Sequence, residues 1–146
     1  MTIPHRVTTH PEFAPRLATC NVLLRRRQTK PTRQLHTLCI DIGGTGIKMI
    51  VLDAVGRPVN ERARELTPRP ATPQAVLEVI RSMIPTQPKF DRVSVGFPGV
   101  VTHGIVHTAP NLEPQAWKLQ NLRAEIEALS GAPTRVLNDA DLQGYG

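Results

Sequence analysis

Between residues 37 and 66, apolar residues occur in short runs that are interrupted by glycine and by turn-forming residues. Thr37–Ile40 leads into a glycine-rich turn, Ile47–Leu52 follows it, and Pro58–Leu66 can add another extended segment after a second turn. Short apolar runs bounded by such residues are typical of β-strands joined by tight turns. The pattern therefore predicts a three-stranded antiparallel meander.

Two later segments show the spacing of amphipathic helices. Thr72 is followed by Pro73, a pair that is typical of a helix start, and the next apolar residues recur with helical spacing as far as Ile84. Pro85 then ends the pattern. Asn121 precedes a second, shorter pattern of the same kind. We predict one helix after Thr72 and another after Asn121, each with an apolar side.

Further strands are predicted at Arg92–Phe97 and Thr134–Leu137, where β-branched and apolar residues dominate, and a short hairpin is predicted at residues 100–106. Cys39, in the first strand, is expected to be a small buried residue. An antiparallel meander followed by alternating helices and strands makes an α/β domain, with a mixed sheet and flanking helices. The order of the elements predicts that fold class.

Residues 1–36 differ from the rest of the chain, since they contain four prolines, no sustained periodicity and seven Lys/Arg residues against one acid. The formal charge of +6 resides in this segment, and the remaining residues are balanced. We predict a basic disordered tail over residues 1–36 and a folded domain over residues 37–146. The tail is either solvated without a role or a loose electrostatic site for a polyanion, and its charge alone gives no reason to expect a nucleic-acid partner.

The two cysteines are too few for a disulfide framework in a chain of this size, and no apolar stretch approaches the length that crosses a membrane. The apolar run that starts at Leu17 is short and is followed by three arginines instead of a cleavage site for a signal peptide. These observations predict a soluble, cytoplasmic protein that has no membrane partner.

The segment from Asp41 to Lys48 carries three glycines within residues 43–46. Glycines leave backbone N–H groups unshielded, which suits the binding of a phosphate. The segment is neither a Walker A loop nor a Rossmann fingerprint, because no Gly-Lys pair is present and no helix follows. A tight hairpin turn would explain the glycines, but it would not explain an acid before them and a lysine after them. Phosphate binding is the better interpretation.

Four segments, in this order along the chain, resemble those of the ROK family, which contains repressors and sugar kinases. They are the glycine segment within residues 38–54, the Pro-Gly loop within 96–106, the Asn-Leu and Trp segment within 108–117, and Asn-Asp-Ala-Asp within 136–141. The resemblance implies the N-terminal α/β domain of the actin-like ATPase (ribonuclease H-like) fold, truncated before the second domain of that family. The second and fourth segments are similar to those of the polyphosphate-using branch of the family.

The resemblance also implies roles for the polar residues of the sugar site. Asp139 matches the catalytic base that accepts the proton of the attacking sugar hydroxyl, and it contacts the sugar as well. Asn111 and Asn138 would bind sugar hydroxyls, because a carboxamide both donates and accepts hydrogen bonds. Pro98 and Gly99 would shape the loop around the sugar. Taken without the resemblance, Asp139 could also be the cap of a following helix.

On the phosphate side, the resemblance implies that Asp41 holds Mg²⁺, through water, because magnesium keeps much of its hydration. Lys48 would add a positive charge beside a phosphate chain, although a solvated strand lysine would give the same pattern. The residues expected to cradle the transferred phosphate or its neighbours are Gly43, Gly44, Thr45 and Gly46.

The implied activity is phosphoryl transfer from polyphosphate or ATP to the 6-hydroxyl of glucose, by a homodimer that uses Mg²⁺. The chain alone is expected to be inactive, because both domains of such a kinase align donor and acceptor. Another ROK hexose kinase, acting on mannose or an amino sugar, remains open, as does a non-catalytic remnant. A repressor is not expected, because residues 1–36 lack the apolar periodicity that a helix-turn-helix needs.

Overall fold

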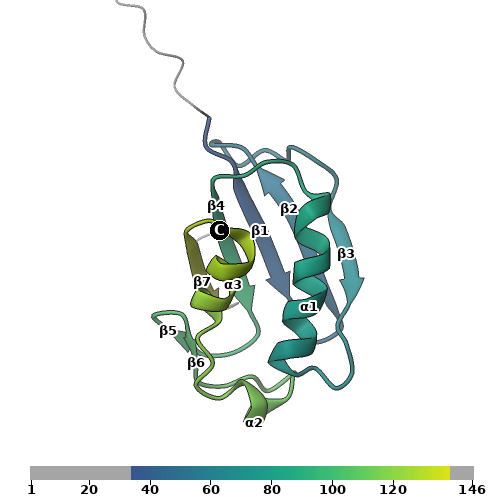
Figure 1. Cartoon of the computed structure of the whole chain (residues 1–146), viewed down its shortest axis with the longest axis vertical. Coiled ribbons are helices and arrows are strands. Elements are labelled where there is room, and N and C mark those ends of the chain that lie inside the picture. Colours follow the sequence, from purple (N-terminus) through teal and green to yellow (C-terminus); the bar gives the residue numbers. More distant parts are fainter. Residues whose placement is uncertain (1–33, 139–146) are drawn as a thin grey trace, which may run out of the picture. The chain divides into compact units, whose positions relative to one another are not determined.

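The computed structural model describes residues 34–138, which form a mixed five-stranded sheet and its flanking helices (Figure 1). The strand order across the sheet is β3-β2-β1-β4-β7. The first three strands form the predicted antiparallel meander, while β4 runs parallel to β1 and β7 parallel to β4. The predicted α/β class with a mixed sheet is confirmed. The bounds are β1 (Thr37–Ile42), β2 (Gly46–Leu52), β3 (Ala63–Leu66), β4 (Arg92–Phe97) and β7 (Thr134–Asn138).

The third strand is shorter than the pattern predicts, because only Ala63–Leu66 pairs continuously with β2. Upstream, the side chain of Asn60 takes the place of a strand partner: its Oδ1 accepts a hydrogen bond from the N–H of Val51 at 2.8 Å. Pro58 forms an isolated bridge with Leu52. A side-chain acceptor therefore interrupts the backbone ladder where the sequence pattern continues.

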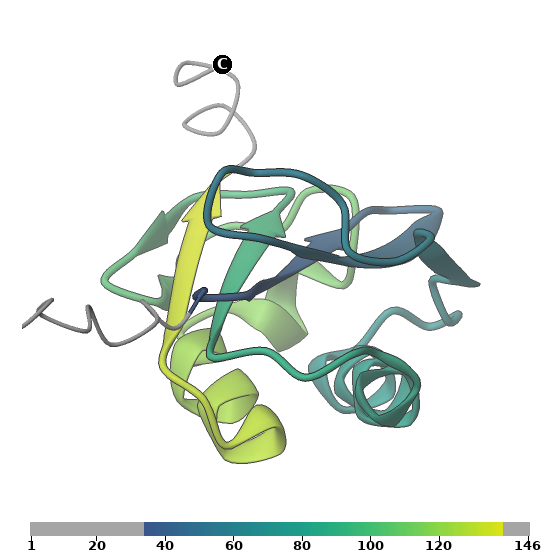
Figure 2. The same ribbon diagram turned by 90° about the horizontal axis from the view of Figure 1, so that it is seen from above.

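Both predicted helices are present and lie on the same face of the sheet (Figure 2). α1 (Pro73–Met83) begins after Thr72, whose hydroxyl accepts from the N–H of Ala75 at 3.3 Å. α3 (Leu122–Ser130) begins after Asn121, whose Oδ1 accepts from Ala124 N–H at 3.1 Å. These side-chain caps satisfy backbone donors that the first helical turn leaves unpaired.

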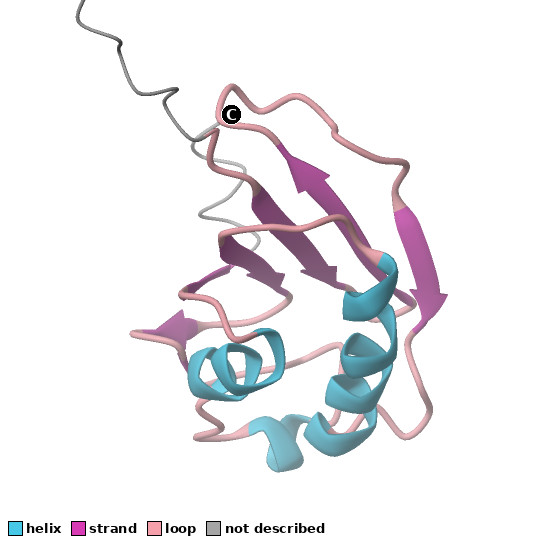
Figure 3. Ribbon diagram, turned by 45° about the horizontal axis from the view of Figure 1, so that its top comes forward, coloured by secondary structure: helices cyan, strands magenta, loops and turns pink. Residues whose placement is uncertain are grey.

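The connections hold smaller elements (Figure 3). The predicted hairpin is present as β5 (Val101–Thr102) and β6 (Ile105–Val106). A 3₁₀ turn, η1 (Ile84–Thr86), follows α1. The short helix α2 (Pro114–Trp117) has no counterpart in the prediction, because four residues are too few to show helical periodicity.

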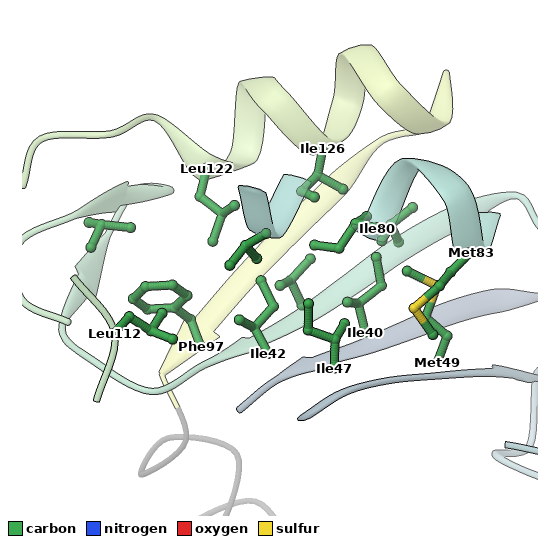
Figure 4. Packing of buried hydrophobic residues seen from close by; sticks show 14 of the residues in the cluster. Ile40, Ile42, Ile47, Met49, Ile80, Met83, Phe97, Leu112, Leu122 and Ile126 are labelled. Atoms are coloured by element: carbon green, nitrogen blue, oxygen red, sulfur yellow. The ribbon is translucent and has the colours of Figure 1, made fainter. Parts of the chain in front are cut away.

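The core lies between the sheet and the two longer helices (Figure 4). Alternate residues of the strands face it, and the helices supply Ile80 and Ile126 from the opposite side. Trp117, from α2, packs against Phe97 with ring centroids 5.0 Å apart, and its Nε1 donates to the Ala71 carbonyl at 2.8 Å. Four of these side chains are fully buried, those of Ile80, Phe97, Trp117 and Ile126. The core fixes the strand register on which the candidate site depends.

The opposite face of the sheet carries no helix from residues 34–138, and we call it the open face (Figure 2). Its side chains include Asp41, Lys48, Ile50 and Ser94. Cys39 also lies here and is half-buried, so the expectation that it is a buried residue is wrong. Strand alternation explains the difference, because Leu38 and Ile40 on either side of it occupy the core face. Partial burial raises the pKa of the Cys39 thiol, with a smaller opposing effect from Arg92.

Candidate functional site

The glycine segment forms the tight turn that joins β1 to β2. Gly43 N–H donates to the Gly46 carbonyl at 2.9 Å, which closes the turn. The N–H groups of Gly44 and Thr45 donate to no acceptor among the described residues. Neighbouring backbone donors without partners form the kind of concave site that binds anions. The turn therefore leaves two neighbouring N–H groups available, and phosphate binding there stays a prediction.

Two side chains from the segment after β3 hold this turn in place. The hydroxyl of Thr67 donates to the Gly43 carbonyl at 2.6 Å, and Arg69 Nη2 donates to the Gly44 carbonyl at 2.7 Å. Thr67 is buried, and its own N–H also reaches the Thr45 carbonyl at 3.4 Å. The turn's carbonyl groups are thus engaged from one direction, while N–H groups remain available. Sequence reasoning missed both residues, because they lie 24 and 25 positions from their partners.

Replacing Thr67 by valine should loosen the glycine turn. The change keeps the shape of the side chain and removes the hydroxyl, so the Gly43 carbonyl loses a hydrogen bond in a buried place. A lost partner of this kind costs about 1–3 kcal/mol. Urea unfolding of the 146-residue chain measures this loss, and inorganic tripolyphosphate titration should show weaker binding.

Thr86→Val is the matched control, because the Thr86 hydroxyl also bonds a backbone carbonyl, that of Met83 at 2.7 Å, in a part of the chain away from the turn. We expect Thr86→Val to leave tripolyphosphate binding unchanged. Equal effects of the two substitutions on binding would show that Thr67 has no special role in shaping the turn.

Asp41 and Lys48 face each other across β1 and β2 on the open face. Lys48 Nζ lies 3.0 Å from Asp41 Oδ2, and both side chains are partly exposed. Lys48 is thus not a fully solvated lysine, since it pairs with Asp41, and its role beside a phosphate chain stays a prediction. Asp41 Oδ1 has no hydrogen-bond partner within residues 34–138. No cluster of three potential metal-ligating side chains occurs in the described part of the chain.

The residues predicted for the sugar site come together at the carboxyl ends of β4 and β7. Pro98, Gly99, Asn111 and Asn138 all line one cavity of about 340 Å³. Pockets at the carboxyl ends of parallel strands are the usual ligand sites of α/β sheets. The remaining lining residues are Val100, Thr108 and Pro110. Asp139, the expected base, lies outside the described residues, directly after Asn138.

Thr108 keeps the Pro98–Val100 loop close to the chain that returns from the hairpin. Its Oγ1 accepts a hydrogen bond from Val100 N–H at 3.0 Å. Gly99 packs so tightly there that a Cβ atom on it would lie 1.9 Å from the Thr108 carbonyl oxygen. Glycine is therefore required at residue 99 for this loop conformation.

The glycine turn and the cavity are in contact. A Cβ atom on Gly44 would lie 3.1 Å from the carbonyl oxygen of Asn111 and 3.2 Å from its Cβ. Gly44 belongs to the turn with the unpaired N–H groups, and Asn111 lines the cavity. An anion held by the turn would therefore lie beside a molecule held in the cavity.

The mixed sheet with flanking helices is a fold that this chain shares with sugar kinases of the actin-like ATPase class, and the glycine turn and the cavity lie at the strand ends of that sheet. Residues 37–146 match the model of the ROK family, and the chain belongs to that family. None of the helices within residues 34–138 is long and apolar enough to span a membrane.

Two named relatives are similar in sequence to about three quarters of this chain. A polyphosphate glucokinase of Mycobacterium tuberculosis is 42% identical over 115 residues, which cover 77% of this chain and 43% of the relative. A glucokinase of Streptomyces coelicolor is 32% identical over 115 residues, 75% of this chain and 34% of the relative. The chain thus spans less than half the length of these relatives.

Solved structures agree with this similarity. An inorganic polyphosphate/ATP-glucomannokinase from Arthrobacter sp. strain KM superimposes with a TM-score of 0.67 at 39% identity, covering 75% of this chain and 46% of that one. A ROK family glucokinase from Streptomyces griseus, in complex with glucose and AMPPNP, gives a TM-score of 0.66 at 28% identity, covering 75% and 35%.

Proposed function

We propose that the protein to which this chain belongs transfers a phosphoryl group from polyphosphate or ATP to the 6-hydroxyl of glucose. The observation that carries the proposal is the contact between Gly44 and Asn111, which joins a turn with two available N–H groups to a pocket lined by Asn111 and Asn138. Phosphoryl transfer requires the donor phosphate and the attacking hydroxyl to lie side by side and in line. The juxtaposition supports this chemistry more directly than either feature alone.

On the acceptor side, Asn111 and Asn138 bind hydroxyls of glucose, and Pro98 and Gly99 shape the wall of the cavity. Asp139 accepts the proton of the 6-hydroxyl as the oxygen attacks the phosphorus. A hydroxyl is a poor nucleophile, so a positioned base lowers the barrier to its attack. The position of Asp139 immediately after β7, whose last residue lines the cavity, supports this role.

On the donor side, the N–H groups of Gly44 and Thr45 hold the transferred phosphate, and Gly43 and Gly46 close the turn around it. Asp41 Oδ1, which has no hydrogen-bond partner within residues 34–138, suits a hydrated Mg²⁺. Protein sites usually bind this ion through one or two carboxylates, several waters and the substrate's phosphates. Bound there, Mg²⁺ would neutralise charge on the donor phosphates. Lys48 orients the Asp41 carboxylate and adds positive charge to the same site.

Polyphosphate is the donor that we favour, with ATP as the second, because the relatives named above include a polyphosphate glucokinase and a polyphosphate/ATP-glucomannokinase. We further expect a homodimer as the working form. Mannose is a second candidate acceptor, since the Arthrobacter relative is named for glucose and mannose together.

A grafted enzyme tests the proposal: residues 37–146 replace the matching segment of the Mycobacterium tuberculosis polyphosphate glucokinase. We expect it to form glucose 6-phosphate from polyphosphate in a magnesium-dependent reaction, and glucose to raise its melting temperature. Assays with mannose and N-acetylmannosamine decide among hexoses. A well-folded graft that neither phosphorylates nor binds any hexose would contradict the proposal.

The 146-residue chain by itself should form no measurable glucose 6-phosphate. It spans less than half of its relatives, and phosphoryl transfer depends on groups that align donor and acceptor from both sides. A coupled assay of the purified chain with glucose, Mg²⁺ and polyphosphate measures this. Magnesium-dependent turnover that co-purifies with the chain would prove the expectation wrong.

A further inference from the structure

A row of charged side chains crosses the open face from β1 to β3. Asp41 pairs with Lys48 in the register of β1 and β2, and Lys48 pairs with Arg64 in the register of β2 and β3. Directly paired residues of neighbouring strands point to the same side of a sheet. Arg64 is therefore on the open face with Lys48, and Arg62, two positions earlier, lines the cavity of about 210 Å³ there.

The positive charges of this row are not balanced. Like charges in directly opposed positions destabilise a sheet, and Lys48 and Arg64 occupy such positions. Asp41 pairs with Lys48 at 3.0 Å, so one carboxylate faces the three cations Lys48, Arg62 and Arg64. Arg62 and Arg64 are exposed, and their side chains make no hydrogen bond or ion pair with any of residues 34–138. Glu65 follows Arg64 in β3 and, by strand alternation, belongs to the other side.

The row is continuous with the glycine turn. A Cβ atom on Gly46 would lie 2.9 Å from Arg64 Nε and 3.3 Å from its Nη2, so the guanidinium packs over the last residue of the turn. Arg62, directly before β3, lies further from the turn and lines the open-face cavity. Within residues 34–138, donors without a partner therefore occur on both sides of Gly46: the N–H groups of Gly44 and Thr45 before it, and the guanidinium of Arg64 against it.

We propose that Arg64 and Arg62 form a binding site for the portion of a polyphosphate chain that extends beyond the phosphate held at the glycine turn. The inference rests on the proposed function, and it adds residues that the phosphate motif does not contain. A guanidinium binds phosphate oxygens in a bidentate manner, and its charge is retained at any physiological pH. A chain of linked phosphates matches a line of separate cations better than a single phosphate does.

The same face is poorly suited to a nucleotide base or a nucleic acid. Binding of unpaired bases relies on stacking against aromatic side chains. Among the described aromatic residues, Phe97 and Trp117 are buried in the core and Phe90 is partly buried against it. None of the residues that line the open-face cavity is aromatic. Cations without aromatic neighbours favour a ligand that consists of phosphate alone.

Binding to the 146-residue chain tests the site, with Arg64→Gln compared with Arg57→Gln. Arg57 is an exposed cation in the turn after β2, at the opposite end of that strand from the glycine turn. Both variants lose one positive charge, but only Arg64 lies against the glycine turn. Residues 1–36 are common to all variants, and their contribution cancels. The probes are polyphosphate of several tens of phosphates, tripolyphosphate and an oligonucleotide of similar charge, titrated calorimetrically at several salt concentrations.

We expect Arg64→Gln to weaken long-chain polyphosphate binding by roughly 5- to 30-fold, which corresponds to one charge-assisted hydrogen-bonded contact. The magnitude of the slope of the logarithm of the binding constant against the logarithm of the salt concentration should also fall by about one. Arg64→Gln should weaken tripolyphosphate binding less than it weakens long-chain binding, and Arg57→Gln should change either by less than about twofold. Equal weakening by Arg64→Gln and Arg57→Gln would overturn the site, as would oligonucleotide binding with the same dependence on Arg64, or a chain that binds tripolyphosphate and long polyphosphate alike.

These outcomes are separate from the test of the proposed function. Glucose phosphorylation by the grafted enzyme, together with equal polyphosphate binding by the two arginine variants, would refute the site and leave the kinase assignment in place. A well-folded graft without hexose binding or turnover would refute the kinase assignment, whatever the arginine variants show.

Discussion

Asp139→Asn in the grafted enzyme should reduce kcat for glucose phosphorylation by about 10²–10⁴-fold, the usual contribution of a general base. Asparagine keeps the size of the side chain and much of its hydrogen bonding, but it accepts no proton from the sugar hydroxyl. The dissociation constant for glucose should therefore change much less than kcat. Steady-state kinetics with polyphosphate, together with glucose binding measured calorimetrically, separates the two effects.

Asp41→Asn provides the contrast to this prediction. Asp41 lies beside the glycine turn and carries one oxygen without a described partner, so its loss should raise the Mg²⁺ concentration needed for half-maximal rate. Glucose affinity should stay the same, because Asp41 does not line the sugar cavity. Near-normal turnover of Asp139→Asn would mean that Asp139 caps a helix and that the base is a different residue.

Most strands and both longer helices follow from local sequence signals. Thr72 and Asn121 cap their helices as the pattern predicts, because a cap depends on residues within one turn of chain. The exceptions have tertiary causes. Asn60 replaces a strand partner of Val51, and the parity of β1 places Cys39 on the open face.

In the candidate site, too, some residues could be predicted from the sequence and others could not. Residues within a motif, such as Gly99 and Asn111, could be selected from the sequence, and the fold brings them to one cavity. Thr67 and Arg69, which hold the glycine turn, could not, because only the paths of β2 and β3 bring them to it. The pairing of Lys48 with Asp41 likewise depends on strand register, which a single sequence does not specify.

Gly99→Ala should disable the sugar loop through a single methyl group. The added Cβ would lie 1.9 Å from the Thr108 carbonyl oxygen and 2.8 Å from its carbon, so the loop must move by about 1 Å or more to restore contact distance. Displacements of that size can reduce a rate by about 10²-fold when they misplace a reacting group. In the grafted enzyme we expect a loss of that order in kcat/KM for glucose and a destabilisation of about 1–3 kcal/mol.

Gly56→Ala separates the loss of stability from the displacement of the loop. Gly56 has a φ of +81° and nothing within 4 Å of its Cβ position, so alanine there is strained without touching a neighbour. The strain costs about 1–2 kcal/mol, in the range expected for Gly99→Ala, and it arises in the turn after β2, outside the sugar cavity. Gly56→Ala should therefore lower the unfolding midpoint and leave kcat/KM for glucose within about twofold at a temperature where both variants are folded. A Gly99→Ala enzyme with the kcat/KM of Gly56→Ala would show that the Pro98–Val100 loop is a structural turn and that glucose is held elsewhere.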